Sequence, residues 1–168
     1  MTVKNRFSPE DWATLVQAPL MAAMAIVAAS PSGPFGVTRE MMAAGRVIQE
    51  TRAGKAGNEL ARAIAEEYSG NVAALPALNV SGMPPKQVHK QAMDCLRRAI
   101  GILYRQNDDE QTEGFKRWLY EISVEVAQAT KEGGFLGFGG QIVSEDESAA
   151  LRQIAWVLGL PSQSAPLP

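Results

Sequence analysis

Apolar residues recur every three or four positions along most of the chain, which is the spacing of a buried face on an α-helix. No stretch shows the strict alternation of a half-buried strand. The first helix is expected to begin at Ser8, where a hydroxyl cap is followed by Pro9, Glu10 and Asp11, and its apolar stripe runs to Val27. The pattern therefore predicts an all-α fold, a compact bundle of about six helices.

Capping residues, glycines and prolines delimit the other helices. The segment Ser30 to Pro34 is expected to end the first helix, and Thr38 to cap the second. The later helices are expected through Leu60 and Ile64, after Pro85, over residues 109–132, and from Ser144 to Gly159.

A weak internal repeat relates the two ends of the chain. Sliding the sequence by 106 residues superposes Trp12 on Trp118 and Thr38 on Ser144. It also brings together two glycine-rich segments, SPSGPFG and KEGGFLGFGG, each between two expected helices. We interpret the pattern as two helix–Gly loop–helix units related by duplication.

The length of 168 residues suits one domain with a substantial core. We expect a single helical domain over residues 1–160, in which the repeated units are residues 8–52 and 109–160. Residues 70–85 contain three prolines and form the expected connector, and residues 161–168 the expected disordered tail.

Composition and charge narrow the function classes. Apolar residues make up 46% of the chain and the net charge is -2, with acids and bases interspersed, so we expect no nucleic-acid partner. The most apolar stretch, Ala18 to Ala29, is too short to span a membrane. Glu10 and Asp11, just before it, argue against a signal peptide. We therefore expect a cytoplasmic protein without a membrane span.

The chain has one cysteine and one histidine, which excludes an intrachain disulfide, a multi-thiolate zinc site and every two-histidine metal motif. Cys95 and His89 are six residues apart on one expected helix and do not share a face. We expect Cys95 to be a buried small hydrophobe and His89 a surface residue. No catalytic constellation emerges from the sequence.

The glycine-rich segment 133–143 does not fit a phosphate-binding loop. A dinucleotide fingerprint starting at Gly137 needs glycine where Ile142 stands, and the Walker pattern needs lysine where Gly140 stands. The following helix begins with three acids, Glu145 to Glu147, which would repel a phosphate. We interpret the segment as a turn between helices.

The acids after the turn have two interpretations. Ser144 and Glu147 match the S-x-x-E capping box, which stabilises a helix start. Alternatively, carboxylates near the turn hold a divalent cation, the one cofactor that the sequence leaves open. Because the segment 133–143 has no carboxylate, the ligands would come from helices; the candidates are Glu147, Glu145, Asp146 and Glu40, with Glu125 and Glu132 as further donors.

The stretch IVSEDESAALRQIAWVLGL resembles the closing segment of the TerB-like tellurite-resistance superfamily, in its apolar-Ser-acid-x-Glu start and its Ile-Ala-x-x-Leu-Gly ending. The whole chain, with its SPSGPFG and KEGGFLGFGG segments, also resembles a set of uncharacterised bacterial proteins. The resemblance implies an all-helical fold with a pseudo-repeat and a link to metal binding and stress response. In place of the family's usual Asp-Gly before the cap, this chain has Gly139, Gly140 and Gln141 in one unit and Pro34, Phe35 and Gly36 in the other.

Three function hypotheses follow. The first is a non-enzymatic helical module that binds a protein partner or itself where the two glycine-rich segments meet, with adaptable methionines as contacts: Met21, Met24, Met41 and Met42. The second is a divalent-metal-binding stress protein that uses the acids named above. The third is an enzyme of unknown class, which would require a deep pocket with convergent acids.

Overall fold

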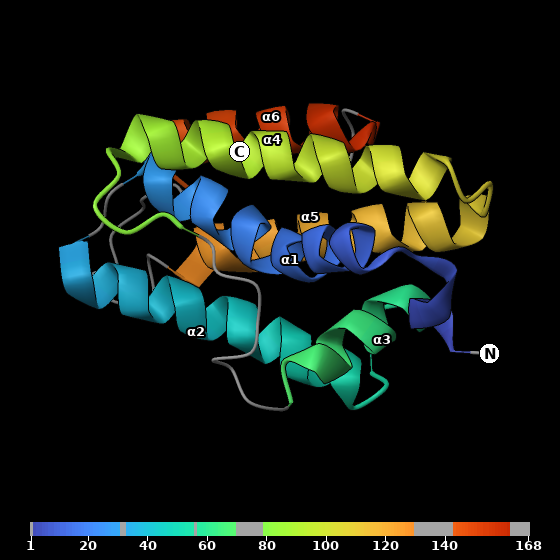
Figure 1. The fold of residues 1–168 in the computed structure, drawn as a ribbon. Coiled ribbons are helices and arrows are strands. Elements are labelled where there is room, and N and C mark those ends of the chain that lie inside the picture. Colours follow the sequence, from blue (N-terminus) through green and yellow to red (C-terminus); the bar gives the residue numbers. More distant parts are fainter. Residues whose placement is uncertain (1, 31–32, 56, 70–78, 130–142, 162–168) are drawn as a thin grey trace.

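The computed structural model describes residues 2–30, 33–55, 57–69, 79–129 and 143–161 (Figure 1). These residues form a short 3-10 helix and six α-helices and contain no strand, which confirms the predicted all-α bundle. The elements in chain order are η1 (Val3–Arg6), α1 (Pro9–Ala29), α2 (Gly33–Arg52), α3 (Glu59–Glu67), α4 (Pro85–Tyr104), α5 (Asp109–Ala129) and α6 (Glu145–Leu158).

Helix α1 lies at the centre of the bundle. It packs most extensively against α4 and α5, and it also contacts α2, α3 and α6 (Figure 1). Small residues make this close packing feasible, since Ala18, Ala22 and Ala25 are completely buried beside Leu15 and Ile26. One hydrophobic cluster joins residues from η1 to the end of α6.

By length and composition, α1 is also the one described helix that could cross a membrane. However, 61% of its most apolar 18-residue window is buried inside the molecule, as in the core helix of a globular bundle. Packing against other helices thus accounts for its apolar composition. The absence of a membrane span stays a prediction.

Local signals fix several helix ends as the sequence predicted. The Ser8 Oγ accepts a hydrogen bond from the Asp11 backbone N–H at 3.1 Å, which caps the start of α1. Gly159 ends α6 in the left-handed conformation, with φ 67°, which glycine adopts at little cost.

The predicted start of the second helix is wrong. Helix α2 begins at Gly33 and Thr38 lies inside it, so Thr38 is not its N-cap. The physical reason lies in Pro34, which follows a glycine with φ 74°. The backbone N–H groups of the first helical turn have no acceptor within the helix. Proline, which lacks an N–H, is therefore tolerated there, and the helix includes Pro34. Most of the segment interpreted as a first glycine loop is therefore helical.

The pattern of burial favours a different register for the predicted repeat. The buried positions of α2 and α6 coincide at a shift of 107, which pairs Glu40, Ala43, Ala44, Val47, Ile48 and Thr51 with Glu147, Ala150, Leu151, Ile154, Ala155 and Leu158. Helices α1 and α5 begin 100 residues apart and have equal length. The predicted shift of 106 instead places buried Leu15 on exposed Glu121. The duplication itself stays a prediction.

A buried hydrogen bond joins α2 to α5. The Trp118 Nε1–H donates to the Thr51 Oγ at 2.8 Å, and the Thr51 hydroxyl donates to the Val47 carbonyl at 2.9 Å. Both side chains are almost fully buried. This pair satisfies the one polar atom of a large core side chain and fixes α2 against the bundle.

A close approach between α3 and α5 requires Gly114. A Cβ at this position would lie 2.4 Å from the Asn58 Nδ2. Asn58 caps α3, because its side chain accepts from the Ala61 N–H at 2.9 Å, and its Nδ2 donates to the Gln111 carbonyl at 2.7 Å. One side chain thus joins the starts of two helices.

We predict that Thr51→Val lowers the free energy of unfolding by about 1–3 kcal/mol, because it leaves the buried Trp118 N–H without an acceptor. Urea unfolding followed by circular dichroism measures this change. Thr14→Val is the matched control, since the Thr14 hydroxyl also bonds the carbonyl four residues earlier but lies near solvent. Equal midpoints for the two variants would show that the Trp118–Thr51 bond does not stabilise the fold.

Candidate functional site

The capping box at the start of α6 is confirmed. The Ser144 Oγ accepts from the Glu147 N–H at 3.2 Å, and the Glu147 Oε2 accepts from the Ser144 N–H at 2.8 Å and from its hydroxyl at 2.9 Å. Glu147 is only 1% exposed. Its carboxylate therefore stabilises the helix start, whatever else it contacts.

The structure places the four candidate metal ligands in different surroundings. Glu145 and Asp146 are exposed in the first turn of α6, beside buried Glu147. Glu40 is buried on α2, which packs against α5, α3 and α1. Among the described residues, no three Asp, Glu, His or Cys side chains come together as a metal site. The segment 130–142 lies outside the described residues, and the metal site stays a prediction.

The lone histidine and cysteine of α4 have structural partners. Cys95 is completely buried, as predicted, and burial raises the pKa of its thiol. His89 is half-buried rather than a plain surface residue. Its Nδ1 lies 3.0 Å from the Ala25 carbonyl, and its Nε2 lies 2.8 Å from the Gln153 Oε1. The imidazole thus links α4 to α1 and α6.

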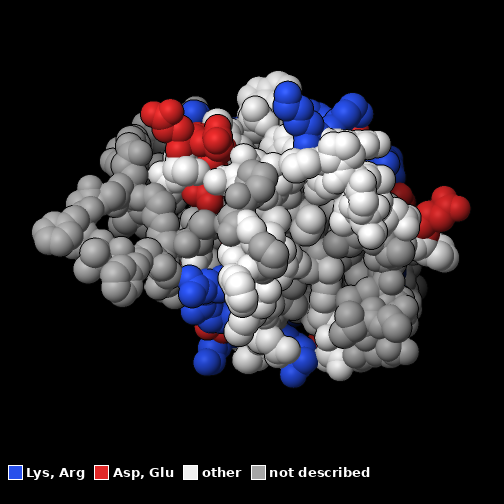
Figure 2. Space-filling model, turned by 90° about the vertical axis from the view of Figure 1, so that its left-hand side faces the viewer, with Lys and Arg blue, Asp and Glu red and all other residues white. Residues whose placement is uncertain are grey.

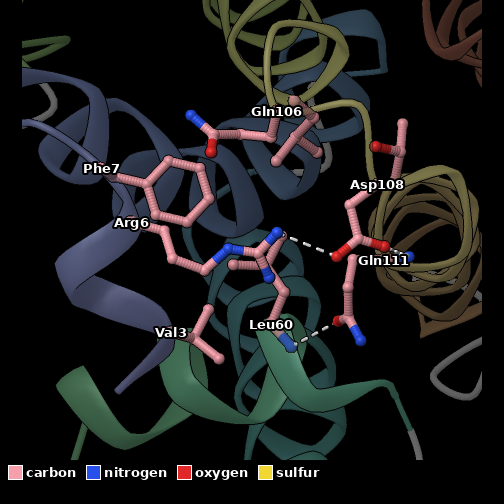
Figure 3. Close-up of a pocket in the computed structure, with 9 residues that line it drawn as sticks. Val3, Arg6, Phe7, Leu60, Gln106, Asp108 and Gln111 are labelled. Atoms are coloured by element: carbon pink, nitrogen blue, oxygen red, sulfur yellow. Dashed lines mark hydrogen bonds and ion pairs between the residues drawn. The ribbon is translucent and has the colours of Figure 1, made fainter. Parts of the chain in front are cut away.

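A cavity of about 10 Å³ lies between η1, α3 and the turn from α4 to α5 (Figure 3). The Arg6 Nη2 binds the Asp108 Oδ2 at 3.0 Å beside it, and the Gln111 Oε1 accepts from the Leu60 N–H at 3.0 Å. This volume holds about one water molecule. The contacts in Figure 3 therefore join helices rather than bind a substrate.

Lys116 of α5 is a buried cation with its own partners. Its Nζ lies 2.6 Å from the Glu113 carboxylate and 2.7 Å from the Tyr104 hydroxyl, and 4.7 Å above the centre of the Tyr104 ring. Burial lowers the pKa of Lys116, but the bonds to Glu113 and Tyr104 raise it more, and the net pKa lies above its ordinary value. Lys116 is thus held charged, which suits packing and not a role as a base.

Exposed aromatic side chains on α2 and α6 are the feature that sequence reasoning missed. Phe35 and Met42 of α2 are 86% and 69% exposed, and Trp156 of α6 is 77% exposed. Of the four methionines proposed as contacts, Met42 is the exposed one, whereas Met21 is buried and Met24 and Met41 are half-buried. The spacing of seven between Phe35 and Met42 becomes a helical signal only when α2 is known to begin at Gly33.

Comparison of the chain with protein-family models, with curated proteins and with solved structures finds no match. The residues described above therefore carry the evidence for function. Among them, Phe35, Met42 and Trp156 are large apolar side chains that lie outside the core.

We predict that Glu147→Gln leaves the fold intact, because glutamine also completes a capping box. Calorimetric titration with calcium, zinc and manganese then tests the metal hypothesis, since a site formed by Glu147, Glu145, Asp146 and Glu40 should release or absorb heat in the natural protein and lose that signal in the variant. No heat at millimolar metal would exclude such a site.

Proposed function

We propose that this protein is a non-enzymatic, TerB-like helical module of the bacterial cytoplasm that acts by binding a protein partner. The observation that carries the proposal is the exposure of Phe35, Met42 and Trp156 on the outer faces of α2 and α6. Isolated exposed apolar residues are common, but Trp and Phe exposed to this extent are typical of contact residues in protein interfaces.

The charged and polar contacts of the described residues support a binding role over catalysis. Lys116 and His89 are engaged in contacts that hold helices together, and Glu147 caps the start of α6. An enzyme usually keeps such groups in a substrate-sized pocket. The cavity beside Arg6 is far too small for that purpose.

The resemblance to TerB-like proteins supports the TerB-like part of the proposal. It rests on the segment from Ile142 to Leu160, which ends in Ile-Ala-x-x-Leu-Gly. In the structure this ending supplies Ile154, Ala155 and Leu158 to the core, while Trp156 points outward. The shared residues thus build the helix, and the exposed tryptophan is available for recognition.

We predict that a photo-crosslinking amino acid at Phe35, Met42 or Trp156 captures the same partner protein in cells. The same probe at Gln87 or Arg98, two exposed polar positions of α4, should not capture it. Mass spectrometry of the crosslinked products identifies the partner. Equal capture from both groups of positions would contradict binding through the apolar side chains.

A companion variant tests the same three side chains without a probe. Changing Phe35, Met42 and Trp156 together to serine should alter stability by only a few tenths of a kcal/mol for each exposed site. It should nevertheless abolish recovery of the partner identified by crosslinking. Unchanged recovery with an unchanged fold would count against the proposed function.

A further inference from the structure

The sulfur atoms of the described residues differ widely in their access to solvent. The chain has seven methionines and one cysteine, and all but Met1 lie in the part that the structure describes. Met42 of α2 is 69% exposed, whereas Met21 is 2% and Met93 is 5% exposed. The other described methionines are half-buried: Met24, Met41 and Met83. A small oxidant in solution therefore reaches the Met42 Sδ more easily than the other sulfur atoms of these residues.

Cys95 does not compete for the oxidant, although thiols are generally the more reactive sulfur groups. The thiolate is the form that attacks a peroxide, and burial raises the pKa of the Cys95 thiol. Cys95 is also completely buried, and its Sγ lies 4.0 Å from the Thr14 carbonyl oxygen of α1. Because the thiol is both protonated and shielded, the first oxidation is expected at a methionine.

Charge does not change this order of access. Lys, Arg, Asp and Glu side chains lie among uncharged residues at the end of the bundle where α2 begins (Figure 2). Such groups attract or repel ligands that carry a charge. Hydrogen peroxide is neutral, so the exposure of each sulfur atom decides which of them it meets first.

We infer that Met42 is a site of oxidative modification by hydroperoxides, and that its sulfoxide weakens partner binding at Phe35 and Met42. The sulfur lone pair attacks one peroxide oxygen and the O–O bond breaks. The other oxygen takes up the proton of the first and leaves as water when the oxidant is hydrogen peroxide. The thioether is thereby oxidised to a sulfoxide and the peroxide is reduced. The inference rests on the proposed function and adds the regulation of the same surface.

The fold of the bundle does not depend on the Met42 side chain. Met42 is not part of the hydrophobic cluster, and the α2 residues that are buried in this cluster are Ala44, Val47 and Ile48. The sulfoxide oxygen at an exposed position stays hydrated, so no polar atom enters the core. Oxidation at Met42 therefore leaves the protein folded, whereas a sulfoxide at Met21 would disrupt the packing of α1.

The same oxygen changes the surface around Phe35. Phe35 and Met42 are seven residues apart on α2, so two turns of the helix bring them to the same side, about 10.5 Å apart along the axis. A thioether is apolar and adapts its shape to a contact, but a sulfoxide is polar and accepts hydrogen bonds. Covering that oxygen without a donor is unfavourable. A partner that binds through apolar contacts therefore binds the oxidised form less tightly.

Timed exposure of the full chain to hydrogen peroxide, followed by peptide mass spectrometry, tests the site. Met42 should gain one oxygen several-fold faster than each of the other described methionines, and Cys95 should stay reduced. Circular dichroism should not change while Met42 reacts. Equal rates at the half-buried methionines, or loss of helix as Met42 reacts, would overturn the assignment of the site.

Photo-crosslinking from Phe35 tests the effect on binding. Capture of the partner should fall several-fold in cells treated with hydrogen peroxide. Met42→Leu is the matched control, because leucine keeps an apolar side chain of similar volume and has no sulfur to oxidise. In this variant, capture should be the same with and without peroxide.

The remaining outcomes separate this inference from the proposed function. If capture from Phe35 persists although Met42 is fully oxidised, the regulation is refuted and the proposed function stands. An equal fall in the Met42→Leu variant would place the effect of peroxide elsewhere and refute the regulation in the same way. Absence of capture from Phe35 even without peroxide would contradict the proposed function, and the regulation with it.

Discussion

The architecture depends on the need to bury α1 on all sides. This helix is built almost entirely from apolar and small residues, and its alanines allow neighbouring helices to approach closely. An amphipathic helix needs one partner, but an all-round apolar helix needs several. The five other α-helices each contribute part of that cover. Each of them therefore has one face directed at the core and another directed at solvent.

A small number of specific polar contacts hold the helices around α1 in place. The Thr51–Trp118 bond joins α2 to α5, Asn58 joins α3 to α5, and His89 joins α4 to both α1 and α6. These contacts fix the orientation of helices that apolar packing alone would leave free to rotate. Because these contacts fix the rotation of α2, the side chains of Phe35 and Met42 stay on its solvent-exposed side. Their exposure is thus a property of the whole bundle and not of one flexible side chain.

The sequence predicted the parts of the fold that depend on local chemistry. Ser8, the Ser144–Glu147 box and Gly159 set helix ends through contacts within a few residues, and all three were recognisable. The start of α2 was missed because proline suits both the end of a loop and the first turn of a helix. The predicted repeat shift of 106 followed identical residues such as the two tryptophans, whereas the buried positions of α2 and α6 match at a shift of 107. The alignment of exposed Phe35 with Met42 on α2 was missed for the first of these reasons, since Phe35 was assigned to a loop.

Chain order gives the central helix a kinetic consequence. Helix α1 precedes every α-helix that covers it, and its most extensive partner, α4, begins only at Pro85. During synthesis the apolar surface of α1 is therefore exposed until much of the remaining domain has left the ribosome. Such a topology raises the contact order above that of a bundle of sequential hairpins and slows folding. The nascent chain is accordingly a natural client for chaperones that shield apolar helices until their partners arrive.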